Sequence, residues 1–423
     1  MKQKNIYLLI LSFFISNNLT AASVAIIYDT PGHYLYSGGF SSAPTDPNDS
    51  MFIIRTNNIT LDFGGNVFFQ DQSTLGVPGF NFIVVNPGFR NVNIVNGFAQ
   101  GFTGTGIIVQ DNNRGLTIDS MVLTGMTNAD IELQGTVTGL TNISISNCSM
   151  ATVNTSDHLA VYGIKGTNIN LLSLASNLQQ VSQTSLTQTC IGILLENVTS
   201  FGINNCRCLA QTASQFAAGI VMKNCKEGLV QNNLVYSSST VNGDGSDIAN
   251  GYELDSCQRI LVQNCQSSVG SASAGSCNGF FAQNGDRNNF NGVLAQSNQG
   301  FLSASGILLS NEVNSNIQGC TLRETFAITA SATGILLMGC SNCNIQSNNI
   351  LDSVGTFSFA IIDDAGASTS AITSNRAFNC GTGYAVTYPN GIQLPVIVGS
   401  LSLNPPGLPS SAGGLIDNIL INP

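Results

Sequence analysis

Residues 334–348 read GILLMGCSNCNIQSN. This stretch opens with a glycine, continues through a short apolar run that can form a strand, turns at Gly339 and Cys340, and begins a second strand at Ile345. The same phrase recurs upstream, where each opening glycine is followed 11 positions later by an apolar residue: Gly192 and Ile203, Gly219 and Val230, Gly251 and Val262, Gly279 and Phe290, Gly306 and Ile317. Successive openings are 27, 32, 28, 27 and 28 residues apart. A fixed period with strand patterning inside each unit predicts a solenoid.

Composition agrees with an all-β solenoid. The chain has 423 residues, which exceeds the usual size of one globular core, but a solenoid escapes that limit because each repeat buries its apolar side against its neighbours. It contains 44 glycines, and only 9% of its residues are charged while 43% are hydrophobic. This balance argues against disorder, so we expect the many Asn, Ser, Thr and Gln residues to lie in ordered turns.

The first residues have the features of a targeting segment. Lys2 and Lys4 precede the apolar run 6–15, and small residues at 20–22 offer a cleavage site. We therefore predict a signal peptide over 1–22 and an exported protein that is secreted, periplasmic or held at the cell surface. No uninterrupted apolar stretch is long enough to span a membrane, so no membrane span is expected.

The charge of the chain limits its partners. Without the two lysines of the signal segment, 11 of the 13 basic residues remain against 23 acidic ones. This net negative charge disfavours nucleic acid and anionic membranes as partners. It also disfavours an anionic polysaccharide, unless a local basic patch overrides it.

Several phrases of the chain resemble those of a known group of proteins. They are NITLDFGGNVFF at 58–69, NVNIVNGFAQGF at 91–102, GTGIIV at 104–109 and the later GIxLxxCxxxxIxxN units. They resemble the right-handed parallel β-helix proteins with pectate-lyase-like architecture, and the resemblance covers nearly all of the chain after residue 22. It implies a right-handed, single-stranded parallel β-helix, and it matches no enzyme family's catalytic motif. Enzymes of this fold place sugar-cleaving sites on an outer sheet face, which the resemblance makes an expectation here.

The residues predict the same architecture without the resemblance. Alternating Val, Ile and Leu suit strands, and coils of this length stack equivalent strands about 4.8 Å apart as parallel sheets. No proline occurs between Pro87 and Pro389, as continuous stacking requires, because proline removes a ladder donor. We predict an N-terminal cap with irregular first coils over 23–90, β-helix coils over 91–383, and a C-terminal capping segment over 384–423 that covers the last open edge.

One turn position is filled by either cysteine or asparagine in coil after coil. It lies three residues after the apolar position of the second strand and is occupied by Cys148, Cys206, Asn233, Cys265, Cys320, Asn348 and Asn375. This predicts an internal ladder in which asparagines exchange hydrogen bonds and cysteines act as small buried hydrophobes. The pair Cys340 and Cys343 has the spacing of a redox pair or half a zinc site, but no second such pair or neighbouring histidines accompany it.

Charged residues of the repeat form the main candidate site. If positions one and three after each opening glycine face inward, positions two and four face outward. This register gathers Glu196, Lys223, Glu253 and Asp255 on one outer face of three successive coils. Such carboxylates could bind Ca²⁺ or divide general acid and base roles, and the lysine could abstract a proton next to a uronate carboxyl. The alternative is a cross-strand ion-pair ladder, which stabilises by only tenths of a kcal/mol per exposed pair.

The remaining acidic and histidine candidates are weaker. Asp244 and Asp247 lie in the loop of the longest repeat, as a weak Ca²⁺ site or an Asx-rich turn. Asp363 and Asp364 resemble part of a polygalacturonase-like pattern, but the accompanying motifs are missing. His158, beside Asp157, reads as a loop histidine because no nucleophile motif accompanies it, and His33 lies in an N-terminal turn.

Outward position two is apolar in most repeats: Leu194, Val221, Phe281, Leu308 and Leu336. A stripe this apolar should be covered by a loop, the C-terminal segment or a binding partner.

Two hypotheses follow. The first is an exported β-helix that binds a polysaccharide, and as a lyase or glycoside hydrolase cleaves it, at Glu196, Lys223, Glu253 and Asp255. The second is a noncatalytic adhesin or structural β-helix with a protein partner at the surface.

Overall fold

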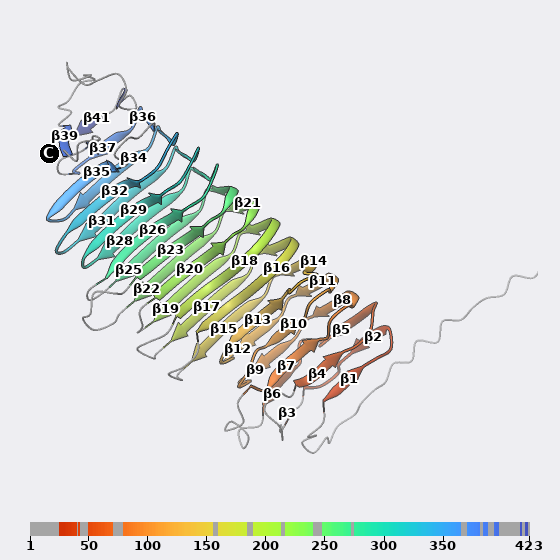
Figure 1. Cartoon of the computed structure of the whole chain (residues 1–423). Coiled ribbons are helices and arrows are strands. Elements are labelled where there is room, and N and C mark those ends of the chain that lie inside the picture. Colours follow the sequence, from red (N-terminus) through yellow and green to blue (C-terminus); the bar gives the residue numbers. More distant parts are fainter. Residues whose placement is uncertain are drawn as a thin grey trace, which may run out of the picture.

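The protein is a parallel β-solenoid in which strands stack coil upon coil along one axis (Figure 1). The computed structural model describes residues 25–39, 41–42, 50–70, 79–154, 160–183, 189–212, 216–239, 248–271, 275–364, 370–380, 384–387, 393–396, 415–416 and 419–421. The described residues contain no helix. The prediction of an all-β parallel β-helix is therefore confirmed, while its handedness, its two caps and its signal peptide stay predictions.

Each coil contributes up to three strands, and each strand pairs with its equivalent in the next coil. The first strands of the coils are β1 (Ile26–Tyr28), β4 (Ser50–Ile54), β7 (Asn81–Val85), β10 (Ile107–Val109), β13 (Ala129–Gln134), β16 (Val161–Ala175), β18 (Thr189–Asn204), β20 (Phe216–Lys223), β23 (Ile248–Asp255), β26 (Ser276–Gln283), β29 (Ser303–Ser310), β32 (Ser331–Met338), β35 (Phe357–Asp364) and β38 (Tyr384–Thr387).

The second strands are β2 (Gly32–Leu35), β5 (Ile59–Asp62), β8 (Arg90–Val95), β11 (Arg114–Asp119), β14 (Leu140–Ser146), β21 (Lys226–Gln231), β24 (Gln258–Gln263), β27 (Asn289–Asn291), β30 (Asn316–Gln318), β33 (Asn344–Gln346), β36 (Ala371–Thr373) and β40 (Leu415–Ile416). In two coils the first and second strands run together, as β16 and β18, so these long strands pair in both columns.

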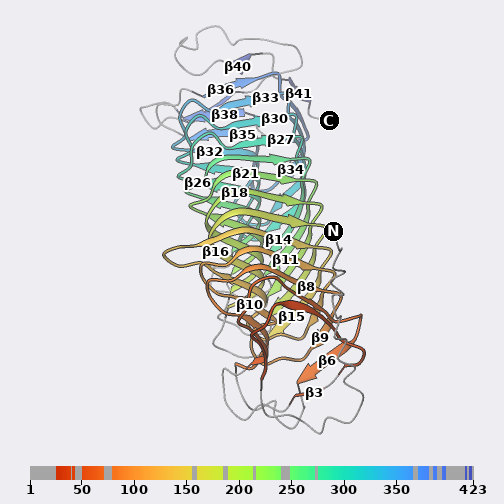
Figure 2. The same ribbon diagram turned by 90° about the vertical axis from the view of Figure 1, so that its right-hand side faces the viewer.

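The third strands are β3 (Ser41–Ser42), β6 (Val67–Gln70), β9 (Phe98–Gln100), β12 (Val122–Thr124), β15 (Ser149–Asn154), β17 (Leu178–Gln183), β19 (Arg207–Thr212), β22 (Leu234–Ser239), β25 (Gln266–Ser271), β28 (Leu294–Gly300), β31 (Thr321–Ala327), β34 (Asn349–Val354), β37 (Arg376–Phe378) and β41 (Ile419–Ile421). They form a sheet of their own, which the turned view sets against the other strands (Figure 2). Strand β39 (Gln393–Val396) pairs with β38 antiparallel.

In the coils whose first strands run from β18 to β32, the opening glycine marks a bend where the first strand closely approaches the third strand. A side chain at Gly219 would overlap Val235 of the third strand, and one at Gly192 would lie 3.0 Å from Cys208 Cβ. The residue after each glycine is also fully buried, as Ile193 and Ile220 show. The glycine and the residue after it therefore both face the interior. The outward side chains before and after them, such as Ile191 and Leu194, come together on the outer side.

The predicted cysteine and asparagine ladder is confirmed. The Asn233 side chain accepts a hydrogen bond from the Cys206 backbone N–H at 2.7 Å and donates one to the Ile203 carbonyl at 2.9 Å. Asn348 and Asn375 repeat this pattern with an additional amide–amide bond of 2.9 Å. All twelve cysteines are buried and free. Each asparagine thus satisfies a backbone N–H and a backbone carbonyl of the preceding coil, as buried backbone groups require.

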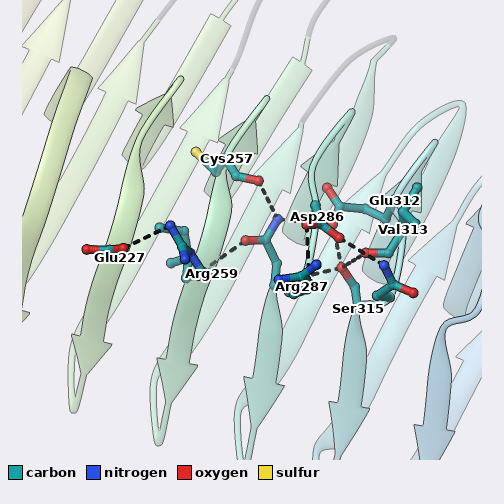
Figure 3. A network of polar contacts seen from close by, with 11 residues as sticks. Glu227, Cys257, Arg259, Asp286, Arg287, Glu312, Val313 and Ser315 are labelled. Carbon is teal, nitrogen blue, oxygen red and sulfur yellow. Dashed lines mark hydrogen bonds and ion pairs between the residues drawn. The ribbon is translucent and has the colours of Figure 1, made fainter.

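The interior is apolar, with polar exceptions at the turns. In the first coils it is filled by aromatic rings, with 5.4 Å between the ring centroids of Phe52 and Phe63. Further along, Glu312 is fully buried and accepts hydrogen bonds from Gly285 N–H (2.9 Å), Asn288 (3.0 Å) and Ser315 (2.7 Å) (Figure 3). Its carboxylate occupies the space that a side chain at position 285 would need. Burial raises the pKa of Glu312 above its ordinary value, and the three hydrogen-bond donors offset only part of that rise.

The sequence predicts that the outward apolar stripe is covered by a loop, the C-terminal segment or a partner, but part of it is buried by neighbouring side chains of its own sheet. Leu194 and Val221 are only 4% and 1% exposed, because the bend packs them against Ile191 and Ala218 in a cluster on the outer side. Phe281 and Leu308 are half-buried. The stripe is therefore largely covered by its own neighbours, and its partial burial alone does not call for a partner.

The close approach at the glycine column leads to a test of the fold. We expect Gly219→Ala to lower the free energy of unfolding by about 1–3 kcal/mol, because the new methyl group overlaps Val235 in a packed interior. Urea denaturation followed by circular dichroism measures it. Gly202→Ala is the matched control, since no atom lies within 4 Å of a side chain there. Equal stability of the two variants would contradict the assigned bend.

Candidate functional site

Three of the four predicted site residues are stacked in one row. The register pairs Thr167 with Glu196, Glu196 with Lys223, Lys223 with Asp255 and Asp255 with Gln283, all half-buried on the outer face. We call these five residues the charged row. In the described part of the chain, no ion pair joins Lys223 to Glu196 or Asp255. The ion-pair ladder considered from the sequence is therefore not formed, and the three charged groups remain available to a ligand.

The fourth predicted residue, Glu253, lies next to the row but deeper. It is 8% exposed, and its Oε2 accepts a hydrogen bond from Asn250 at 2.7 Å. Asn278 donates to Asn250 Oδ1 at 2.9 Å and so fixes the orientation of that amide. Burial raises the pKa of Glu253, which the Asn250 hydrogen bond and the charge of Lys223 partly offset. Glu253 therefore keeps its proton to a higher pH than an ordinary glutamate.

An ion pair closes the N-terminal side of this face. Lys165 Nζ lies 3.0 Å from Glu132 Oε1 on the neighbouring coil and 5.4 Å from the centre of the Tyr162 ring. Burial lowers the pKa of Lys165, but its hydrogen bond and ion pair with Glu132 raise it by more. The charge of Lys165 is thus neutralised within the protein.

A polar hollow of about 320 Å³ adjoins the charged row. Asn168 and Asn197, which line it, directly follow Thr167 and Glu196 of the row. Its walls come from the turn between β13 and β14 and from strands β16 and β18, and its polar side chains are Thr136, Thr138, Thr141, Asn168, Asn170, Asn197 and Thr199. We call the space lined by these residues the hollow. The hollow is shallow and largely open to solvent.

The turn that forms one wall of the hollow is held in place by Asp111. The Asp111 carboxylate accepts hydrogen bonds from the backbone N–H and hydroxyl of Thr136 and from the hydroxyl of Thr138, at 2.9 Å for the first and the last. Slight burial raises the pKa of Asp111, but these donors hold it well below its usual value. Asn168 adds a bond to the Gly135 carbonyl at 3.0 Å. The wall is therefore preorganised.

Other side chains of the hollow remain open to a ligand. Among the described residues, the side chains of Thr141 and Asn197 form no hydrogen bond. The side chain of Asn170 forms one, in which its Oδ1 accepts from the Thr199 hydroxyl at 3.3 Å. Hydroxyl and amide groups in this state can donate to and accept from the hydroxyls of a ligand.

The sequence did not point to the hollow. Most of its residues belong to coils before Gly192, where the departure of 152–188 from the repeat obscured the register. A signal exists in retrospect, because Thr141, Asn170 and Thr199 fill equivalent positions of three successive coils.

Several other sequence candidates are not part of this site. Asp244, Asp247 and His158 lie outside the described residues. Asp363 is 3% exposed, on the last complete coils, far along the chain from the charged row. Cys340 and Cys343 are both buried in one turn. His33 Nε2 lies 3.9 Å from Asp62 Oδ2.

Two kinds of feature are absent from the described ranges. They hold no group of three His, Cys, Asp or Glu residues placed to bind a metal ion. Nor do they hold a helix long and apolar enough to cross a membrane.

Comparisons with known proteins find likeness in structure only. No family model matches the chain, and no curated protein matches it. Tailspike protein 3 of bacteriophage CBA120 aligns at 10% identity and a TM-score of 0.48 over 94% of this chain, which spans 54% of the tailspike chain. The mannuronan C-5 epimerase AlgE4 A-module of Azotobacter vinelandii aligns at 13% identity and a TM-score of 0.42, covering 77% of this chain and 88% of its own. The periplasmic alginate epimerase AlgG aligns at 11% identity and a TM-score of 0.42, covering 84% of this chain and 77% of its own.

The environment of Glu253 gives a testable pKa. Asn250→Ala removes the hydrogen bond that stabilises the charged carboxylate, so we expect the pKa of Glu253 to rise further above that of an ordinary glutamate. Titration of the ¹³C-labelled glutamate carboxyl carbons by NMR measures it, with Glu253→Gln to assign the signal. A lower or unchanged pKa in Asn250→Ala would contradict the described contact.

Proposed function

We propose that the protein binds a polysaccharide lengthwise along the surface formed by the hollow and the charged row. The observation that carries this proposal is that open hydroxyl and amide side chains line a preorganised hollow directly beside unpaired charged groups. Sugar hydroxyls both donate and accept hydrogen bonds, as these side chains do. A polymer fits because both features continue across successive coils, so equivalent groups recur about every 4.8 Å.

The site also suits a ligand of this class because the protein has already fixed its wall. Asp111 and Asn168 hold the turn between β13 and β14, so binding does not have to order it. The predicted export of the protein would bring such polymers within reach.

Binding is tested by removing two hydroxyls of the hollow. We expect the double variant Thr141→Val and Thr199→Val to bind its polysaccharide about thirtyfold more weakly, since each of the two lost hydrogen bonds costs roughly 1 kcal/mol. The probe is a panel of acidic and neutral polysaccharides, measured by affinity electrophoresis. Thr124→Val, on the outer face of the third-strand sheet, is the matched control. Absence of binding across the panel by wild-type protein would refute the proposal.

Cleavage of the bound polymer is a second candidate, favoured by the different surroundings of two carboxyl groups. Glu253 is buried with a raised pKa, and Asp255 follows two positions later on the same outward side of β23, with Lys223 beside it. In this candidate Glu253 acts as general acid, Asp255 as base, and Glu196 and Lys223 position the substrate.

The same panel tests cleavage by its products. We expect new reducing ends or unsaturated ends with wild-type protein, at least a hundredfold slower formation with Glu253→Gln, and unchanged binding by that variant. Binding without any product from wild-type protein would identify a noncatalytic binding protein instead.

A further inference from the structure

Two arginines stand directly opposite each other beside the hollow. Arg90 of β8 and Arg114 of β11 are register partners on neighbouring coils, and both are exposed. No ion pair involves either of them in the described part of the chain. Like charges directly opposite each other in a sheet are destabilising. In a chain with only 13 basic residues and a net charge of −10, such an uncompensated pair is unusual.

The arginine pair is in line with the hollow. Arg114 pairs in register with Thr141, Thr141 with Asn170, Asn170 with Thr199, and Thr199 with Lys226. Lys226 is exposed and makes no ion pair with the residues described. The column therefore begins with two cations, crosses three hydrogen-bonding side chains of the hollow, and ends with a third cation.

Two cations on the coils that follow Lys226 are paired with acidic side chains. Arg259 lies 2.8 Å from Glu227, and Arg287 lies 3.4 Å from Asp286 (Figure 3). The acidic group closest in sequence to Arg114 is Asp111, whose carboxylate is engaged by Thr136 and Thr138. Glu196 borders the hollow on its other side, at the charged row. Three cations without an ion pair among the described residues thus lie in one column, from Arg90 to Lys226.

We propose that this column binds the anionic groups of an acidic polysaccharide, with Arg90 and Arg114 as one anion site and Lys226 as another. This rests on the proposed function and specifies its ligand. Arginine suits the role because its planar group donates two parallel hydrogen bonds to one carboxylate or sulfate. The three hydrogen-bonding positions between the cations hold the intervening sugar. The column is the local basic patch that lets a protein of net negative charge accept a polyanion.

A matched pair of polymers tests the proposal. The first probe is a polyuronate, and the second is the same polymer after chemical reduction of its carboxyl groups to neutral alcohols. We expect wild-type protein to bind the polyuronate at least tenfold more tightly than the reduced polymer, with an affinity that falls as salt is added. We expect Arg90→Gln with Arg114→Gln to remove most of that preference. A sulfated polymer as third probe distinguishes recognition of carboxylate from recognition of any anion.

Controls separate this inference from the proposed function. Arg259→Gln removes one positive charge that is already paired with Glu227, so it should leave the preference unchanged. Circular dichroism of the arginine variants confirms folding. Equal binding of the native and reduced polymers, or an equal loss in Arg259→Gln, would overturn the anion site while leaving polysaccharide binding intact. Failure to bind any of the three polymers would overturn the anion site, and absence of binding across the whole panel of acidic and neutral polysaccharides would overturn the proposed function as well.

Discussion

The stacking of coils in register is the constraint on which the rest of the structure depends. Parallel pairing sets every side chain about 4.8 Å from the equivalent side chain of the coil before and the coil after. Each side chain must therefore be compatible in size and charge with the equivalent side chains of the adjacent coils. The asparagine ladder satisfies this condition by hydrogen bonding along the column, as Asn348 and Asn375 do. Arg90 and Arg114 do not satisfy this condition, because two like charges lie opposite each other on adjacent coils.

The same constraint explains the distribution of small and large residues. The glycine column exists because the first strand bends against the third, where Gly219 touches Val235. Gly285 leaves room for the buried carboxylate of Glu312, which then receives three hydrogen bonds. Adjacent coils thus compensate one another, and a substitution in one coil is felt in the next.

The sequence predicted the parts of the molecule that repeat. From Gly192 onward, the period and the alternation of apolar residues placed Glu196, Lys223 and Asp255 in one row, and the structure agrees. The burial of Leu194 and Val221 could not be predicted, since it depends on how the bend brings outward side chains together.

The hollow was missed for a different physical reason. Its wall is a turn held by Asp111, and because these hydrogen bonds occur at one turn only, they leave no periodic trace in the sequence. The pairing of Arg90 with Arg114 likewise becomes visible only in the register of adjacent coils, because the two residues are 24 positions apart in the sequence and no motif marks them.

These features combine into one surface. Open polar groups in the hollow, unpaired cations at its ends and the charged row beside it follow the direction in which the coils stack. A polymer that lies along this direction meets equivalent groups coil after coil, whereas a compact ligand would meet only one part. On the coils that follow Lys226, Arg259 and Arg287 are paired with Glu227 and Asp286 and do not extend the column.

Hydrogen–deuterium exchange of the protein with and without a saturating acidic polysaccharide tests the central claim most directly. The account predicts slower exchange in 135–142, 168–171 and 197–200 on binding, and no change in the third strands at 207–212. Protection confined to the third-strand sheet, or bound polymer without protection around the hollow, would contradict it.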